Sequence, residues 1–364
     1  MDTVKNMYAL GASFNFYMIH GGTNFGFWNG AKVEGAVITS YDYTAPISEA
    51  GDFLSIATKL RDWIKTLDGW PSAPQDLPAA MLRRSYSRVA LGKTALVTEM
   101  TKGKCVNAPD PVSFEQVRQH FGYLQYTTII PHDEMTYLSI DHLEDFGYVF
   151  LDHQRQGMFI KQYFNTSVRI VTLNDLKPGS RLDIIVENQG RQTDQTINDF
   201  KGILSPVKLD NIVLTNWTTC ALSVSAPYES RREGIELDTS DEASGVYQGT
   251  FSVDTVADTW INMRGWGKGH VVINGHNVGR YWSTVGPQYN LFVPSPLLNV
   301  GNNSVSVYEF LGATKDACND SGTCTVSFDD HADITFTDDQ PETTTHIETT
   351  TERAAPLQSL SVFL

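Results

Sequence analysis

A segment rich in aromatic and amide side chains stands near the start of the sequence. Residues 17–30 read YMIHGGTNFGFWNG, and residues 41–52 read YDYTAPISEAGD. Aromatic faces stack on the apolar C–H faces of sugar rings, and Asn and Tyr form directed hydrogen bonds with sugar hydroxyl groups. This pattern suggests a saccharide-binding rim. The alternative, which an isolated aromatic cluster favours, is that the rings only pack in a core. The rings belong to Tyr17, Phe25, Phe27 and Trp28.

Several carboxylates accompany this rim. Retaining glycoside hydrolysis needs two carboxyl groups about 5–5.5 Å apart, one as nucleophile and one as acid/base. Asp42 and Glu49 sit among turn residues, where Asp and Glu commonly accept hydrogen bonds from the backbone or cap a helix. This context favours a structural role over a catalytic one. The full set of nearby carboxylates is Glu34, Asp42, Glu49 and Asp52.

Motifs for other kinds of chemistry are missing from the sequence. It has no Gly-rich phosphate loop, no HExxH zinc motif and no GxSxG nucleophile elbow. Its nine histidines are scattered, without the spacing of metal ligands. The net charge of −15 argues against a nucleic-acid partner and fits neutral or weakly charged ligands. We therefore expect no metal, no cofactor and no nucleic acid.

The four cysteines and the sequons indicate an oxidising compartment. Cys318 and Cys324 bracket the polar loop CNDSGTC and favour a disulfide; a metal site is the alternative, but no His is near and the CxxC spacing is absent. Cys105 and Cys220 stand alone in the sequence. Four Asn-X-Ser/Thr sequons are candidates for N-glycosylation. They are Asn165, Asn216, Asn302 and Asn319.

The N-terminus conflicts with this compartment. The first residues, MDTVKNMYALGAS, lack a basic region followed by an apolar core, so no signal peptide is visible. No run approaches the eighteen or so apolar residues that a membrane-spanning helix requires, so no membrane span is expected.

The elements that position the rim are one strand and one helix. Residues 13–19, SFNFYMI, predict a buried strand that ends at the rim. Apolar residues recur with helical spacing between Phe53 and Leu67, with Asp52 as a plausible N-cap. A single βα unit cannot bury both faces of its strand, so it must belong to a larger structure.

The remainder of the sequence predicts β-structure. The proline-rich residues 70–80 mark a linker, and short β-branched and aromatic runs with intervening turns follow, as is typical of β-sandwiches. YVFLDHQRQGMF (148–159) is similar to HVVINGHNVGRYW (270–282), which indicates two related sandwiches. The Thr/Glu-rich residues after about 331 lack apolar periodicity and predict a disordered tail.

Taken together, these segments resemble glycoside hydrolase family 35, the β-galactosidases. YMIHGGTNFGFWNGA and ITSYDYTAPISEAGD are similar to the last barrel strand and the loop after it. The resemblance covers about residues 8–330 and is strongest to the lysosomal branch of animals, in which a TIM barrel precedes two β-domains and the paired cysteines near the end recur as a disulfide. Further matching segments are VENQGRQ (186–192), INDFKGI (197–203), GWGKGHVVINGHNVGRYW (265–282) and GPQYNLFVP (286–294).

The resemblance carries over one substrate-binding residue and no catalytic residue. In that family the second Tyr of the YDY motif lines the galactose pocket, and here it is Tyr43. The acid/base lies in an Asn-Glu motif after an earlier barrel strand, and the nucleophile Glu follows the strand before the one seen here. Neither motif occurs in this sequence. The resemblance implies that about seven of the eight barrel units are missing.

The expected fold class is mainly β: two jelly-roll or galactose-binding-like β-sandwiches preceded by the last βα unit of a truncated TIM barrel. The orphan unit is expected to be disordered or only loosely docked. The expected divisions are a barrel remnant at 1–69, a linker at 70–85, a first β-sandwich at 86–205, a second, galactose-binding-like β-sandwich at 206–330 and a disordered tail at 331–364.

These resemblances imply a β-galactosidase. The full-length parent would hydrolyse terminal β-galactosyl residues with retention, in the lysosome or vacuole or as a secreted protein, with a β-galactoside as partner and a homo-oligomer as one option. A fragment of such a protein would also explain the missing signal peptide. This chain alone is expected to be inactive. The alternative is a non-catalytic galactoside-binding or scaffolding protein built from two β-sandwich modules.

Overall fold

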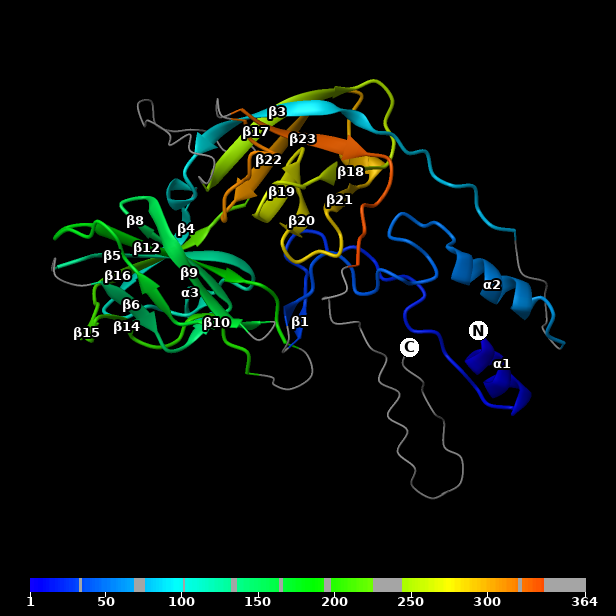
Figure 1. Cartoon of the computed structure of the whole chain (residues 1–364), viewed down its shortest axis with the longest axis horizontal. Coiled ribbons are helices and arrows are strands. Elements are labelled where there is room, and N and C mark those ends of the chain that lie inside the picture. The colour runs from blue at the N-terminus through cyan, green and yellow to red at the C-terminus, as the bar shows by residue number, and fades with distance from the viewer. Residues whose placement is uncertain are drawn as a thin grey trace, which may run out of the picture. The chain divides into compact units, whose positions relative to one another are not determined.

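A computed structural model describes residues 1–32, 35–68, 76–100, 102–131, 136–163, 166–192, 198–224, 244–319 and 323–336. The described backbone is mainly β, as the sequence predicts (Figure 1). The chain divides into two compact units. The first unit comprises Met1–Thr23, Ser40–Leu82 and residues from Ile334 onward, and the second comprises Asn24–Thr39 and Arg83–Asp333.

Two helices shape the first unit: α1 (Asp2–Ala9) and α2 (Ser55–Ile64). The helix predicted between Phe53 and Leu67 is confirmed, but Asp52 does not cap it, because the helix starts after Leu54. The Asp52 carboxylate instead accepts a hydrogen bond from the Ser48 hydroxyl at 3.0 Å.

The strand expected at residues 13–19 does not form. In the described residues this segment has no neighbouring strand, and only an isolated bridge joins His20 to Ile47. A strand needs a partner for its backbone N–H and C=O groups, and apolar composition alone does not supply one. Aromatic packing holds the segment instead: the Phe14 ring lies 5.8 Å from the ring of Trp63 in α2.

The first group of strands in the second unit forms antiparallel sheets of seven, four and two strands. The seven-stranded sheet has the order β10-β9-β8-β12-β5-β16-β4, the four-stranded sheet β11-β6-β14-β15, and the small sheet β13-β7. The strands are β4 (Lys102–Ala108), β5 (Gly122–Ile129), β6 (Tyr137–Ile140), β7 (Leu143–Glu144), β8 (Phe146–Leu151), β9 (Gln154–Tyr163), β10 (Thr166–Val168), β11 (Ile170–Thr172), β12 (Arg181–Asn188), β13 (Gly202–Ile203), β14 (Val207–Leu209), β15 (Ile212–Val213) and β16 (Trp217–Leu222). The short helix α3 (Phe114–Val117) and the 3-10 turn η1 (Val97–Glu99) accompany them.

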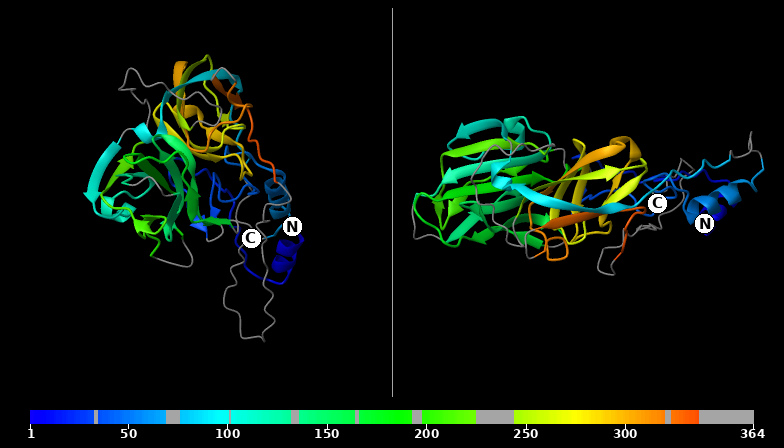
Figure 2. Two further views of the ribbon diagram at one scale, coloured as in Figure 1. Left: turned by 60° about the vertical axis from the view of Figure 1, so that its left-hand side comes forward. Right: turned by 90° about the horizontal axis from the view of Figure 1, so that it is seen from above.

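The second group forms one eight-stranded antiparallel sheet of order β20-β19-β22-β17-β3-β23-β18-β21. In both views of Figure 2 its yellow and orange strands lie beside the green strands of the first group. The two end strands, β20 and β21, contact each other, so the sheet curls toward a barrel. Its members are β3 (Tyr86–Ala95), β17 (Gly245–Val253), β18 (Thr259–Asn262), β19 (Lys268–Ile273), β20 (His276–Trp282), β21 (Asn290–Val293), β22 (Gly301–Glu309) and β23 (Cys324–Asp329), with the 3-10 turn η2 (Ser295–Leu297). A separate pair, β1 (Ala31–Lys32) and β2 (Gly35–Ala36), lies in the Asn24–Thr39 segment.

Four strand assignments differ from the expected division at residues 205 and 206. Strand β3 pairs with β17 and β23 in the eight-stranded sheet, although the sequence placed it in the first sandwich. Strands β14, β15 and β16 lie beyond residue 206 but belong to the first group, where β14 pairs with β6 and β15, and β16 pairs with β4 and β5. The pairing partner decides membership, and a sequence of similar β runs does not reveal which runs pair over long separations.

The weak internal repeat corresponds to two equivalent hairpins. Strands β8 and β9 turn at Asp152 and His153, and strands β19 and β20 turn at Asn274 and Gly275, all four with positive φ. Such pairs suit two-residue turns whose twist matches that of the strands. In both hairpins the second strand has one extra residue immediately before a glycine: Gln156 before Gly157, and Val278 before Gly279.

Three apolar clusters form the core of the second unit. One fills the first group of strands and contains Trp217, and another fills the eight-stranded sheet and contains Trp266. The third draws on both groups: Phe146 and Tyr148 from β8 meet Trp282 and Phe310. The two groups of strands therefore share a buried apolar junction.

Candidate functional site

The rim residues of the first unit are held by close backbone contacts. The Tyr41 N–H donates to the Gly21 carbonyl at 3.2 Å, and the Ile47 N–H donates to the Ile19 carbonyl at 3.0 Å. A Cβ atom on Gly21 would collide with the Asp42 backbone and the Ser40 side chain. The HGG turn and the SYDY turn therefore pack directly together. Only glycine fits at position 21, because there is no room for a Cβ atom.

Tyr43, the residue expected to contact galactose, lies in this turn and is half-buried. Its hydroxyl oxygen accepts a hydrogen bond from the Ser40 N–H at 3.3 Å. The side chain is thus oriented by the turn that carries it. Its contact with substrate remains a prediction.

The rim carboxylates serve local structure in the described residues. One Asp42 oxygen accepts from both the Thr44 N–H (2.8 Å) and the Thr44 hydroxyl (2.9 Å). The Glu49 carboxylate accepts from the Thr23 hydroxyl at 2.7 Å. These contacts agree with the structural role that the turn context favoured. Glu34 lies outside the described residues.

The four rim aromatics fall into two classes. Phe25 and Phe27 pack against the apolar clusters, and the Phe27 ring lies 4.5 Å from the His270 ring. Tyr17 and Trp28 are exposed, with 43% and 81% of their surfaces accessible. Core packing therefore accounts for two of the rings and not for the other two.

Three fully buried charged side chains meet at the junction of the two strand groups, and we call them the hub: Glu187, Lys268 and Arg280. The Lys268 Nζ lies 2.5 Å from Glu187 Oε2, and the Arg280 Nε lies 2.7 Å from Glu187 Oε1. The Tyr148 hydroxyl also donates to Glu187, at 3.0 Å. Lys268 Nζ further lies 3.9 Å from the centre of the Phe146 ring, within cation–π range.

Electrostatics keep the hub charged. Burial by itself raises the pKa of Glu187, but Lys268 and Arg280 outweigh it and hold that pKa below its ordinary value. Burial lowers the pKa of Lys268 to about 8, against the opposing effect of Glu187. At neutral pH the hub therefore holds one carboxylate between two cations.

His270 lies beside the hub and is also fully buried. Its Nδ1 atom is 2.9 Å from the Tyr123 hydroxyl, and within the described part of the chain its Nε2 atom has no hydrogen-bond partner. Burial lowers the pKa of His270 to about 3, and the positive charge of Arg280 adds to this effect. The native state therefore holds this imidazole neutral.

This neutral histidine predicts a loss of stability in acid. Unfolded His has a pKa near 6.5, so between about pH 6.5 and pH 3 the unfolded state binds a proton that the native state does not. The contribution of the neutral His270 to the free energy of unfolding is fully present above pH 6.5. It falls by about 1.4 kcal/mol for each pH unit below that value. Between pH 7 and pH 5, the free energy of unfolding should fall about 2 kcal/mol more in the wild type than in His270→Gln.

Urea titrations at the two pH values measure this difference. His276→Gln is the matched control, because His276 is exposed in the same hairpin. The control should keep the wild-type pH dependence. Equal pH dependence of the wild type and His270→Gln would show that His270 is not held neutral.

A second buried ionic cluster holds the INDFKGI segment. The fully buried Lys201 Nζ lies 2.7 Å from Asp145 and 2.9 Å from Asp199. Asp145 also accepts from the Gln189 N–H at 2.9 Å, and Asp199 accepts from the Gln192 N–H at 2.8 Å. The VENQGRQ segment is therefore fixed by charged groups on both sides.

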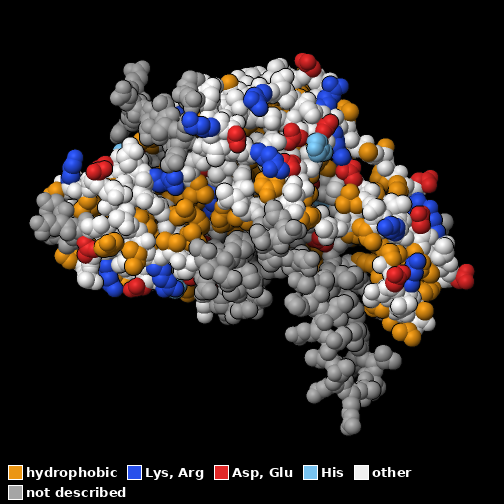
Figure 3. Space-filling view, viewed as in Figure 1, with side chains coloured by type: hydrophobic (Ala, Val, Ile, Leu, Met, Phe, Trp, Pro, Cys, Tyr) orange, Lys and Arg blue, Asp and Glu red, His pale blue; other side chains and the backbone are white. Residues whose placement is uncertain are grey.

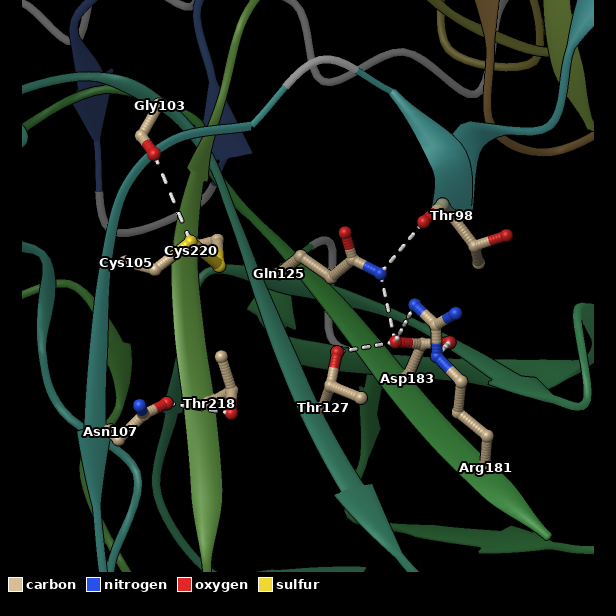
Figure 4. Close-up of a disulfide and its surroundings, with 10 residues drawn as sticks. All are labelled: Thr98, Gly103, Cys105, Asn107, Gln125, Thr127, Arg181, Asp183, Thr218 and Cys220. Carbon is tan, nitrogen blue, oxygen red and sulfur yellow. Dashed lines mark hydrogen bonds and ion pairs between the residues drawn. A yellow bond between two sulfur atoms is a disulfide. The ribbon is translucent and has the colours of Figure 1, made fainter. Parts of the chain in front are cut away.

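Two disulfides join the four cysteines. Cys318 pairs with Cys324, as the sequence favoured, and Cys105 pairs with Cys220, which the sequence had left alone. Figure 4 shows the second bridge between the adjacent strands β4 and β16, where the two residues are paired in register. Only strand pairing brings these cysteines together, since 115 positions separate them.

Three of the four sequons lie among the described residues. Asn216, Asn302 and Asn319 are exposed, and Asn165 lies outside the described residues, as does most of the expected tail.

None of the helices in the described residues has the length and apolar character needed to span a bilayer. Figure 3 shows acidic and basic side chains interspersed on the visible face. The described residues contain no group of three or more candidate metal ligands.

A groove of about 570 Å³ lies on the first group of strands. Several of its polar groups already have partners: Gln116 closes a capping box with Ser113, and the His142 ring lies 3.2 Å from Glu144. None of the rim or hub residues lines it. The walls include Asp110, Pro111, Phe200, Ile203, Leu204 and Pro206.

Family models match consecutive parts of the chain. Residues 1–67 match glycosyl hydrolases family 35, residues 111–223 match the β-galactosidase first all-β domain, and residues 245–303 match the β-galactosidase galactose-binding domain. The chain belongs to the family 35 β-galactosidases. The two domain matches fall within the two groups of strands, and the family 35 match contains the rim.

Relatives in this family include whole β-galactosidases. The chain is 38% identical to β-galactosidase of Mus musculus over 361 residues, which is 90% of this chain and 54% of the relative. It is 36% identical to β-galactosidase of Homo sapiens, covering 90% of this chain and 52% of the relative. The chain therefore spans about half the length of these family 35 relatives. A solved family 2 β-galacturonidase from Eisenbergiella tayi covers 68% of this chain with 14% identity and a TM-score of 0.25, too low to support an argument.

Sequence reasoning missed the hub. The signal lay in the runs RLDIIVEN and GKGHVVI, where charged residues interrupt strands that are otherwise apolar. A charge in a buried strand requires a partner, but the sequence does not show which residue provides it.

Proposed function

We propose that this chain is the part of a retaining β-galactosidase that carries the galactose-contacting rim and two supporting β-domains. The whole protein hydrolyses terminal β-galactosyl residues through a covalent glycosyl-enzyme intermediate. The observation that carries this proposal is the succession of three family matches, with the YDY turn inside the family 35 match. Tyr43 supplies a hydrogen bond to galactose.

The two catalytic carboxylates are not proposed among these residues. The family motifs that hold them do not occur in the sequence. Asp42 and Glu49, the carboxylates nearest Tyr43 in the sequence, are engaged with Thr44 and Thr23. The chain alone should therefore not hydrolyse galactosides.

The proposed compartment is the lysosome or vacuole, or the cell exterior. Two disulfides support it, because disulfides persist in oxidising compartments. The three exposed sequons are accessible to glycosylation there.

Galactoside binding without hydrolysis is the second candidate function. The match of residues 245–303 to a galactose-binding domain favours it. In this case the β-domains, and not the rim, would contain the binding site. Substitution at Tyr43 distinguishes the two candidates.

Turnover and binding assays on the purified chain test the proposal. No release of chromophore from a β-galactoside is expected, with an intact family 35 enzyme as the positive control. Galactose binding, measured by calorimetry, should weaken by about fivefold to tenfold in Tyr43→Phe, as expected for a lost hydrogen bond of about 1 kcal/mol. Tyr41→Phe is the matched control, because Tyr41 is an exposed tyrosine of the same turn.

Three results would contradict this assignment. Turnover by the chain would show that it contains catalytic carboxylates. Equal galactose binding by the wild type and Tyr43→Phe would favour a site on the β-domains. Failure of the wild type to bind galactose would remove the rim from the proposed substrate site.

A further inference from the structure

The segment Asn24–Thr39, which we call the strap, lies between the HGGT turn (20–23) and the SYDY turn (40–43) in the sequence. It belongs to the second unit, while the residues on either side of it belong to the first. The Asn24 N–H donates to the Thr39 carbonyl at 2.7 Å, so the ends of the strap are joined. The chain continues directly from these ends into the HGGT and SYDY turns.

One buried guanidinium binds the strap to both groups of strands. Arg280 Nη1 donates to the Val37 carbonyl of the strap at 3.4 Å and to the Gln189 carbonyl at 3.3 Å. Its Nε is held by Glu187, so the guanidinium is fixed in place by the hub. Arg280, which lies in strand β20, therefore forms hydrogen bonds with both the end of strand β12 and the strap.

The VENQGRQ segment provides a second anchor. The Ala31 N–H donates to the Arg191 carbonyl at 3.1 Å. Gly190 has a φ of +121°, and a Cβ atom there would collide with the backbone of Asn29 and Gly30. The strap backbone thus lies directly against this segment.

The GHNVG and GPQYN segments provide further anchors. The Gly26 N–H donates to the Asn277 carbonyl at 3.0 Å. The Thr39 hydroxyl donates to the Gln288 side chain at 3.0 Å. Between these points, the Phe27 ring stacks 5.6 Å from the Phe121 ring.

We propose that Arg280, held by Glu187, is a positioning residue that fixes the strap against both groups of strands. The VENQGRQ, GHNVG and GPQYN segments of the β-domains all contact the strap and hold it in place. The arrangement of Glu187, Arg280 and the strap, which we call the clamp, does not rest on the proposed galactoside function.

Hydrogen–deuterium exchange of the full chain tests this proposal. In folded Arg280→Lys, the lysine keeps the charge but loses the paired contacts of the guanidinium. Peptides covering residues 24–39 should exchange at least about tenfold faster than in the wild type, while peptides of β5 and β22 change less than about twofold. Arg264→Lys is the matched control, because Arg264 is half-exposed and pairs with Asp333. It should leave strap exchange unchanged.

Two further variants, at uncharged residues that contact or belong to the strap, test the clamp if Arg280→Lys does not fold. Gly190→Ala pushes on Asn29 and Gly30, and Thr39→Val removes the bond to Gln288. Either should raise strap exchange without raising core exchange. Unchanged strap exchange in a folded variant, or an equal rise in all peptides, would overturn the clamp. Galactose binding by the wild type is a separate readout, so a failure of the proposed function is distinguishable from a failure of the clamp.

Discussion

Replacing Glu187 with glutamine is expected to lower the free energy of unfolding by about 3 to 5 kcal/mol. The substitution keeps the size of the side chain but removes the only carboxylate between Lys268 and Arg280 in the hub. Arg280 would then remain buried without a counter-charge, and Lys268, whose pKa burial lowers to about 8 even beside Glu187, would lose its proton more readily. The cost exceeds the value of the lost hydrogen bonds, because an unpaired buried guanidinium keeps its full desolvation penalty and a buried lysine must give up its proton.

Urea denaturation at neutral pH measures this loss. Asp141→Asn is the matched control: it removes an exposed carboxylate that lies 3.2 Å from Lys208. An exposed pair of this kind contributes at most about 1 kcal/mol. If Glu187→Gln were no more destabilising than the control, the hub would not carry the charges assigned to it.

Removing the Cys105–Cys220 bridge is expected to cost about 5 kcal/mol. The bridge closes a loop of 115 positions, and the chain-entropy relation for a loop of that length predicts this value. The Cys318–Cys324 bridge closes a loop of only 6 positions, for which the same relation predicts about 2 kcal/mol. The long-range bridge should therefore stabilise the fold more than twice as strongly as the short one.

Paired alanine substitutions at each bridge measure the difference in urea denaturation. Cys105→Ala with Cys220→Ala should give a much lower denaturation midpoint than Cys318→Ala with Cys324→Ala. Cys220, Cys318 and Cys324 are buried, so the loss of buried side-chain surface lowers the free energy of unfolding of both variants. An equal or larger effect of the short bridge would mean that loop closure does not dominate.

The two bridges also show how sequence distance limits prediction. The partners of the short bridge flank one turn, so their proximity follows from the sequence. The partners of the long bridge meet only because strands β4 and β16 pair in the seven-stranded sheet. A list of β runs does not contain that pairing.

The rim shows the same division. The helix at Ser55–Ile64 follows from local composition, and it is present. The strand predicted at residues 13–19 is not, because strand formation depends on a neighbour that the described residues do not supply. The helix satisfies its own backbone hydrogen bonds and so needs no such neighbour.

The sequence by itself determined the β class, the family, the position of Tyr43 and the two repeated hairpins. These depend on short-range patterns: alternation, turn residues and motifs of a few positions. Only the tertiary structure decided that β3 crosses into the second group of strands, that Cys105 meets Cys220, and that Glu187 lies between Lys268 and Arg280. Each of these joins residues far apart in the chain, and such contacts are selected by the packing of the whole fold.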